Sequence, residues 1–146
     1  MTMTPEAQLR AIDTIRRSLE GSLNGLQILV VEDNAKDAEL TLTSLREFGL
    51  QSEWAKNMAD TLRFIGANTP WLIFLDLQLG EYSGVKVLSA VKAFKSETKV
   101  VVLTGAYEHG SEQCNEALRL GAIAIMKKPL TQEQIQFIFG APGAAP

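Results

Sequence analysis

The chain has 146 residues, 46% of them hydrophobic and 21% charged, which is enough for one sizeable core and too little for two. Its 14 Lys and Arg against 17 Asp and Glu give a net charge of −3, without the basic excess that favours nucleic acid or anionic membranes. The amino terminus lacks an apolar signal core, no apolar run could span a bilayer, and the single Cys114 has no disulfide partner within the chain. We therefore expect one globular domain in the cytoplasm, with no nucleic-acid or membrane partner.

Residues 1–25 are predicted to form a helical extension and a linker ahead of this domain. Apolar residues recur at spacings of three and four between residues 5 and 24, which is typical of a helix with one apolar face. The simpler interpretation is that this face packs on the chain's own domain, and the alternative is a dimerisation or docking helix. Gly21, Asn24 and Gly25 end the pattern and indicate the linker.

Strand and helix patterns alternate through residues 26–140. The predicted strands are short apolar runs, at residues 26–31, 51–56, 71–76, 99–104 and 122–126. The predicted helices have amphipathic spacing with cap or stop signals, at residues 35–48, 57–65, 85–94, 112–120 and 131–139. Five strand-helix repeats predict an α/β domain with a doubly wound five-stranded parallel sheet and helices on both faces. Residues 80–84 are expected to form a loop, and residues 141–146 a flexible tail.

Acidic, hydroxyl and basic side chains stand where these strands end. The first strand ends at Glu32 and Asp33, the central strand at Asp76, the fourth at Thr104 and the fifth at Lys128. Because open α/β sheets bind ligands at the carboxyl ends of their strands, we expect these residues to share one site. Three close carboxylates need a cation to stay ionised, and all-oxygen ligation is what Mg²⁺ prefers. The sequence therefore predicts a divalent metal, Mg²⁺, at this edge.

The same residue types suit the transfer of a phosphoryl group. A carboxylate beside Mg²⁺ is a competent nucleophile, and Asp76 is the expected acceptor because it ends the most central strand without an acidic neighbour. Glu32 and Asp33 would hold the metal. Lys128 and the Thr104 hydroxyl, together with a loop amide, would stabilise the phosphoryl oxygens.

Four segments together resemble the receiver domain of two-component response regulators: VVEDN, LIFLDLQLGEYSG with its Gly eight residues after the Asp, VVLTGA and KKPL. The resemblance covers residues 26 to about 139 and implies a flavodoxin-like fold. It implies phosphotransfer to Asp76 from a histidine kinase or histidine phosphotransfer protein, in a phosphate acceptor that is not a dedicated enzyme. It also implies Mg²⁺ held by Asp33 and Asp76, by Glu32 through water, and by the Gln78 backbone carbonyl.

The resemblance further implies a conformational switch. Thr104, which precedes Gly105, and Lys128 would move toward the phosphate and rearrange the surface of the fourth helix, fifth strand and fifth helix. A homodimer could form through this surface or through the N-terminal helix. Lys128 matches the family, rather than Lys127, because it directly precedes Pro129 through a peptide bond that the family usually has in cis.

Three features depart from the family's pattern. The family usually has Pro four residues after the acceptor, where Gly80 loosens the loop near the metal-ligating carbonyl. The switch position three residues before the lysine is usually aromatic, whereas Ile125 has no group that could hydrogen-bond a hydroxyl. No DNA-binding or catalytic segment follows the short final helix, so output is expected from the receiver surface, the N-terminal helix or onward transfer of the phosphate.

Three alternatives stand beside the phosphorylatable receiver. A haloacid dehalogenase-type phosphatase also uses an Asp nucleophile at a strand end, but it needs a second Asp where this chain has Gln78, and it is set aside. A pseudo-receiver would be an interaction module without the chemistry, and only the departures at Gly80 and Ile125 favour it. The chain could also be a receiver excised from a longer multidomain regulator, which its APGAAP ending permits.

Overall fold

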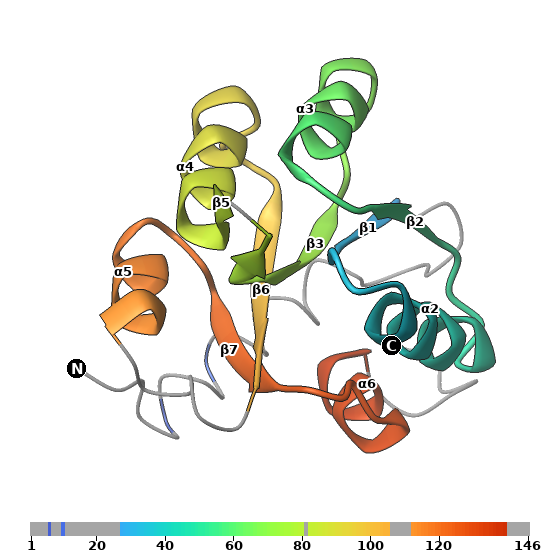
Figure 1. Cartoon of the computed structure of the whole chain (residues 1–146). Helices are drawn as coiled ribbons and strands as arrows, with labels where there is room; N and C mark the ends of the chain where they lie inside the picture. The colour runs from blue at the N-terminus through green and yellow to red at the C-terminus, as the bar shows by residue number, and fades with distance from the viewer. Residues whose placement is uncertain (1–5, 7–9, 11–26, 81, 106–111, 140–146) are drawn as a thin grey trace.

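The computed structural model describes residues 6, 10, 27–80, 82–105 and 112–139 (Figure 1). Helices and strands alternate along this part of the chain. In order they are β1 (Ile28–Val31), α2 (Ala35–Glu47), β2 (Ser52–Ala55), α3 (Met58–Ala67), β3 (Leu72–Asp76), β4 (Gln78–Leu79), β5 (Tyr82–Ser83), α4 (Gly84–Phe94), β6 (Lys99–Thr104), α5 (Glu112–Arg119), β7 (Ala124–Lys127) and α6 (Gln132–Phe139).

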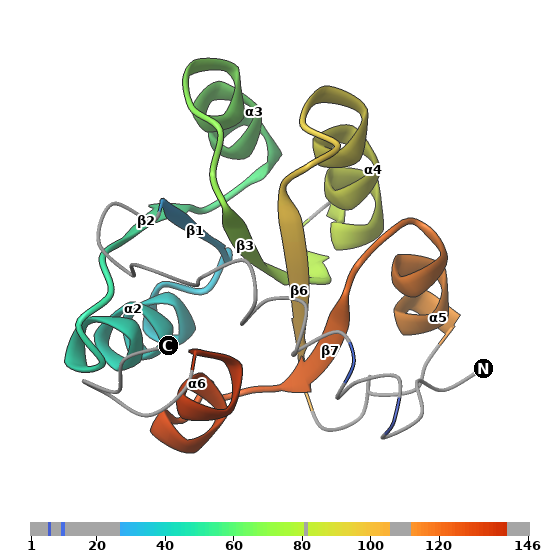
Figure 2. The same cartoon turned by 180° about the vertical axis from the view of Figure 1, so that it is seen from behind.

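Five strands form one parallel sheet in the order β2-β1-β3-β6-β7. The helices α2 and α6 cover one face of this sheet, and α3, α4 and α5 cover the other (Figures 1 and 2). This strand order is that of flavodoxin-like doubly wound folds, in which the ligand site lies outside the carboxyl ends of the strands. The predicted α/β class and five-stranded parallel sheet are therefore confirmed.

The core consists of two apolar layers, one on each face of the sheet. One layer joins Phe74 of β3 to α2 and α6, where the Phe48 and Phe139 rings lie 6.2 Å apart. The other joins the sheet to α3, α4 and α5 and includes the buried Cys114. Every residue of β3 is buried, which explains why its sequence is a continuous apolar run rather than an alternating one.

The segment after β3 differs from its predicted loop. Strands β4 and β5 form a short antiparallel ladder that pairs Gln78 with Ser83 and Leu79 with Tyr82. Gly80 follows β4 with φ +59°, a left-handed conformation that glycine adopts without steric cost and that tight hairpin turns require. Strands of two residues are too short to give a periodic pattern, so the sequence alone did not predict them.

Other element boundaries shift by a few residues. The last strand, β7, begins at Ala124 instead of residue 122, because the Ala122 N–H donates to the Ala117 carbonyl at 2.9 Å and still belongs to the end of α5. The helix predicted over residues 5–24, apart from residues 6 and 10, and the tail at residues 141–146 lie outside the described residues. No helix of the described part of the chain is long and apolar enough to cross a membrane.

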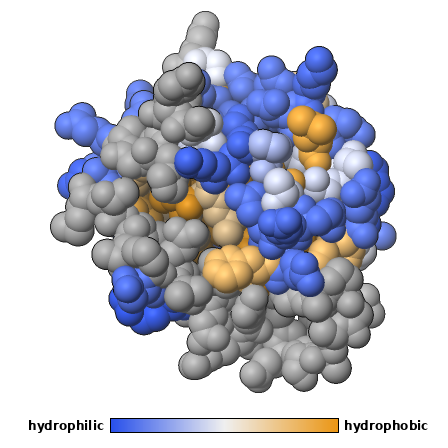
Figure 3. All heavy atoms as spheres, turned by 90° about the horizontal axis from the view of Figure 1, so that it is seen from below, coloured by the Kyte–Doolittle hydropathy of each residue, from blue (hydrophilic) through white to orange (hydrophobic). Residues whose placement is uncertain are grey.

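Large apolar side chains are exposed at a few separate positions among the described residues, namely Leu40, Trp54, Phe94 and Phe137. Seen from below, the apolar surface of the described residues lies in several areas among hydrophilic ones (Figure 3). Scattered apolar side chains are normal on a protein surface, and we assign them no docking role.

Candidate active site at the carboxyl edge of the sheet

The ends of β1 and β3 bring three acidic residues together. Asp76 is the last residue of β3, and Glu32 and Asp33 directly follow β1, which pairs with β3 in parallel. One carboxylate oxygen of each residue lies within 4.8 Å of the others. Glu32 and Asp76 are buried, with 3% and 5% of their surfaces exposed, whereas Asp33 is exposed. The predicted cluster of carboxylates therefore forms, and it opens to solvent at Asp33.

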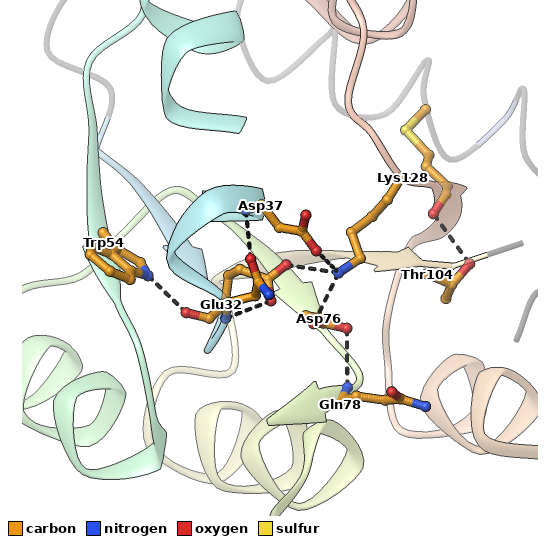
Figure 4. A network of polar contacts seen from close by, with 9 residues as sticks. Glu32, Asp37, Trp54, Asp76, Gln78, Thr104 and Lys128 are labelled. Atoms are coloured by element: carbon orange, nitrogen blue, oxygen red, sulfur yellow. Dashed lines mark hydrogen bonds and ion pairs between the residues drawn. The ribbon is translucent and has the colours of Figure 1, made fainter. Parts of the chain in front are cut away.

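The Lys128 ammonium group lies among these carboxylates (Figure 4). Its Nζ is 2.8 Å from Glu32 Oε1, 3.1 Å from Asp76 Oδ2 and 3.2 Å from Asp37 Oδ2. Lys128 follows β7 and precedes Pro129 through a cis peptide bond, as the resemblance implies. Lys127, the last residue of β7, is exposed. Of the two lysines, Lys128 is therefore the one that lies among the acidic residues, and its role in the site stays a prediction.

Asp37 is a member of this site that the sequence did not predict as one. It is the third residue of α2, and its backbone N–H donates to Oδ1 of the N-cap residue Asn34 at 2.9 Å. Because α2 begins soon after β1 ends, its first turn lies above the same edge of the sheet. An acidic residue in the first turn of a helix that follows a site strand is the sequence feature that could have indicated it.

Burial and charge shift the pKa values of two groups in the cluster. Burial, together with the neighbouring Asp76 carboxylate, raises the pKa of Glu32 to about 8, although Lys128 acts in the opposite direction. Burial lowers the pKa of Lys128, but its hydrogen bonds and charge interactions with Glu32 and Asp76 outweigh this effect and raise that pKa above its usual range. The one positive charge of Lys128 does not balance the negative charges of the acidic cluster. This shortage of positive charge fits a site that also binds a cation.

The backbone around Glu32 is held by the edge strand β2. The Trp54 indole N–H donates to the Glu32 carbonyl at 2.8 Å, and the Glu32 N–H donates to the Ala55 carbonyl at 3.0 Å. The Asn34 N–H donates to Glu32 Oε2 at 3.2 Å. These contacts fix the turn between β1 and α2, so the acidic side chains it carries face the edge of the sheet.

The turn after Asp76 is also held by hydrogen bonds. The Gln78 N–H donates to Asp76 Oδ1 at 3.1 Å, and the Gly84 N–H donates to the Leu77 carbonyl at 2.6 Å. A β carbon at Gly84 would lie 2.5 Å from the Asp76 carbonyl oxygen, so only glycine fits there without a backbone shift. This contact explains the glycine eight residues after the acidic residue. The role of the Gln78 carbonyl as a metal ligand stays a prediction.

Thr104 reaches the same edge of the sheet without joining the cluster. It ends β6, is fully buried, and its hydroxyl donates to the Met126 carbonyl at 3.5 Å. In Figure 4 this hydroxyl points toward that carbonyl and away from Asp76. Gly105 follows Thr104 at the end of the strand, and Ile125 is buried in the apolar layer toward α3, α4 and α5. The expected convergence thus holds for the three acidic residues and Lys128, but the Thr104 hydroxyl is turned away.

Comparison with known protein families identifies the family of this domain. A family model described as the response regulator receiver domain matches residues 28–138, which includes every residue of the cluster. The chain belongs to this family. It is a receiver domain of the kind found in two-component response regulators, as the four sequence segments indicated.

Individual relatives agree with this assignment. The acid tolerance regulatory protein ActR of Sinorhizobium medicae is 28% identical over 108 residues, covering 74% of this receiver and 55% of ActR. The regulatory protein LuxO of Vibrio cholerae is 32% identical over 108 residues, covering 73% of this receiver and 23% of LuxO. The receiver thus spans about half, or less, of the curated relatives it matches.

A solved structure gives the same result in three dimensions. The crystal structure of a response regulator from Burkholderia pseudomallei is similar, with a TM-score of 0.68 and 26% sequence identity. The match covers 77% of this receiver and 65% of that chain. That crystal structure contains a phosphorylated aspartic acid, a calcium ion and citrate.

Proposed function

We propose that this receiver is a phosphoacceptor of a two-component or phosphorelay system, in which Asp76 takes a phosphoryl group from a phosphohistidine in a metal-dependent reaction. The donor would be a histidine kinase or a histidine phosphotransfer protein. The observation that carries the proposal is the Lys128 Nζ at 3.1 Å from Asp76 Oδ2, inside a cluster of buried carboxylates. Such a chain accepts a phosphoryl group once per cycle and is not a dedicated enzyme.

The metal would be held by Glu32, Asp33 and Asp76, with the Gln78 backbone carbonyl as a further ligand. Hard oxygen ligands suit Mg²⁺, which usually keeps several waters and binds through one or a few carboxylates. One carboxylate oxygen of each residue lies within 4.8 Å of the others, which is close enough for the three to bind a single ion. The calcium ion in the Burkholderia pseudomallei structure supports a divalent cation in proteins of this family. A bound Mg²⁺ would neutralise charge that builds up on the phosphoryl group.

In the proposed reaction, a carboxylate oxygen of Asp76 forms a bond to phosphorus while the P–N bond to the donor imidazole breaks. Lys128, which is already hydrogen-bonded to Asp76, would donate to one phosphoryl oxygen. The Thr104 hydroxyl would leave the Met126 carbonyl and donate to another. The bond between them is long, at 3.5 Å, so breaking it costs little.

The phosphorylated receiver would act through a change in its protein-binding surface or by passing the phosphoryl group on. Turning the Thr104 hydroxyl toward the phosphate would alter the end of β6 and its hydrogen bond to β7. The surface of α5, β7 and α6 adjoins these strands and is the proposed place of the response. In a longer regulator it would face the output domain.

Intact mass measurement after incubation with acetyl phosphate tests this function, with and without Mg²⁺, on the wild type and the Asp76→Asn variant. We expect an adduct of one phosphoryl group that requires the metal and is absent from the variant. An adduct retained by Asp76→Asn would show that another residue is the acceptor. No adduct under any condition would overturn the proposal and favour an interaction module that lacks the chemistry.

A further inference from the structure

Asp37 differs from the other carboxylates that contact Lys128. The Lys128 ammonium group has three N–H donors, and three carboxylates lie within hydrogen-bond distance of it. Glu32 and Asp76 also belong to the metal-ligand cluster, whereas Asp37 does not. Among the described residues, Asp37 is therefore the one carboxylate contact of Lys128 that a metal would leave unchanged.

We propose that Asp37 is a positioning residue, which keeps the Lys128 ammonium group beside Asp76 while Glu32 and Asp76 turn to the metal. This inference rests on the proposed function. The lysine side chain is long and has many rotamers, so an ammonium group that loses two of its three partners would spread over many positions. A retained ion pair with Asp37 limits this spread and leaves two N–H donors for the incoming phosphoryl group.

The place of Asp37 is fixed by the backbone of α2. Asn34 caps the helix through the Asp37 N–H, and the next residue, Ala38, is buried against the sheet. The helix therefore does not depend on the metal for its position. The Asp37 side chain is 43% exposed, whereas that of Lys128 is 18% exposed, so the pair lies where the buried cluster opens to water. Solvent weakens the pair, which favours a role in orientation over a large contribution to stability.

The chain offers a matched control for this role. Asp60 is the third residue of α3, behind the N-cap residue Asn57, whose Oδ1 accepts from the Asp60 N–H at 2.8 Å. Its side chain pairs with Arg63 at 3.1 Å on the helix surface instead of with a site residue. The Asp60→Asn variant therefore reproduces the loss of a first-turn carboxylate from a capped helix without touching Lys128.

The first measurement is the ¹H–¹⁵N NMR signal of the Lys128 ammonium group in the protein with saturating Mg²⁺, assigned by its loss in Lys128→Arg. An ammonium group that is held by hydrogen bonds exchanges its protons slowly enough to give such a signal. We expect the signal in the wild type and Asp60→Asn, a weakened signal in Asp37→Asn, and a recovered signal in Asp37→Glu. An unchanged signal in Asp37→Asn, or equal weakening in Asp60→Asn, would overturn the proposal.

The second measurement is the rate of phosphorylation at saturating acetyl phosphate and Mg²⁺, with the Mg²⁺ affinity measured separately by calorimetry. We expect Asp37→Asn to lower the rate by about threefold to tenfold, as for the loss of one hydrogen bond of ordinary strength at a partly exposed position, and Asp37→Glu to restore it. The Mg²⁺ affinity should change by less than about threefold, because Asp37 is not a ligand and faces solvent.

The two measurements separate the inference from the proposed function. Phosphorylation of the wild type together with an unchanged rate in Asp37→Asn would overturn the role of Asp37 alone. No phosphorylation of the wild type would overturn the proposed function, and with it any role of Asp37 in phosphotransfer. A rate loss in Asp37→Asn that Asp37→Glu does not reverse would count against positioning by the carboxylate.

Discussion

Gly84 packs directly against the backbone of Asp76, although it lies eight positions later in the sequence. A β carbon at Gly84 would lie 2.5 Å from the Asp76 carbonyl oxygen and 2.5 Å from the Leu77 α carbon. Both atoms belong to the backbone that carries the proposed acceptor, so no flexible side chain could move aside. The glycine thus sets how closely α4 approaches the end of β3.

We predict that Gly84→Ala lowers the free energy of unfolding by about 2–4 kcal/mol, because the methyl group forces the backbone near Asp76 to move. Urea unfolding followed by circular dichroism measures this change. Gly66→Ala is the control, since Gly66 lies in α3 with no atom near its added β carbon. Alanine there should be neutral or stabilising by about 0.5–1 kcal/mol. Equal stability of Gly84→Ala and the wild type would contradict the close contact.

Gly80 leads to a second prediction, since it stands where the family usually has proline. Its φ of +59° is far from the value near −65° that a proline ring imposes. Gly80→Pro should therefore lower the free energy of unfolding by about 1–3 kcal/mol, even though it introduces the residue that is common in the family. Gly80→Ala should cost less, about 1 kcal/mol, because alanine tolerates the left-handed region with strain. Urea unfolding of both variants checks this order, and a stabilised Gly80→Pro would show that the turn differs from the one described.

The pKa of Glu32 predicts a pH dependence of metal binding. A pKa raised to about 8 means that a proton competes with a metal ion for Glu32 near neutral pH, because the proton must leave before the carboxylate faces a cation. The Mg²⁺ affinity should thus rise with pH up to about 8, by at most about tenfold per pH unit, and level off above. Calorimetry at pH 6.5, 7.25 and 8 measures this slope.

Glu32→Gln should abolish most of that slope, because glutamine does not titrate. Glu39→Gln, at an exposed position of α2, should keep it. The effect on folding has the opposite sign: a carboxyl group with a raised pKa holds more protons in the folded state, so stability without metal should fall as pH rises from 4.5 to 8. A metal affinity that does not change between pH 6.5 and 8 in the wild type would contradict the raised pKa.

Trp54 gives a fourth prediction, because its indole N–H donates to the backbone carbonyl of Glu32. Trp54→Phe removes this donor and keeps most of the ring. We expect a loss of about 0.5–1.5 kcal/mol in the free energy of unfolding, and a Mg²⁺ affinity that is lower by up to about tenfold. The affinity is measured by calorimetry instead of tryptophan fluorescence, because this substitution removes one of the tryptophans.

Trp71→Phe is the matched control for Trp54→Phe. The Trp71 ring packs on Phe139, with the ring centroids 6.4 Å apart. Trp71 directly precedes β3, so it lies at the amino ends of the strands, away from the acidic cluster at their carboxyl ends. This variant should lose stability with its Mg²⁺ affinity unchanged. If both tryptophan variants weakened Mg²⁺ binding equally, the effect would come from general loosening of the fold instead of the hydrogen bond to Glu32.

Local patterns in the sequence determined the fold class and most of the site. The apolar run that ends at Asp76 indicated a central strand, because a strand covered on both faces needs apolar side chains at every position. Glu32 and Asp33 could be assigned to the same edge because parallel strands all end on one side of the sheet. The Pro129 that directly follows it distinguished Lys128 from Lys127. Each of these conclusions depends on residues that are near one another in the chain.

Only the tertiary structure decided which side chains meet across long separations. Lys128 and Asp37 are 91 residues apart, and their contact depends on how α2 sits above the sheet. The bond from Trp54 to Glu32 depends on the parallel pairing of β1 and β2. The Thr104 hydroxyl points to Met126 because rotation about a single side-chain bond, which no sequence pattern encodes, sets its direction. Strand ends follow from local periodicity, whereas side-chain contacts follow from the packing of whole elements.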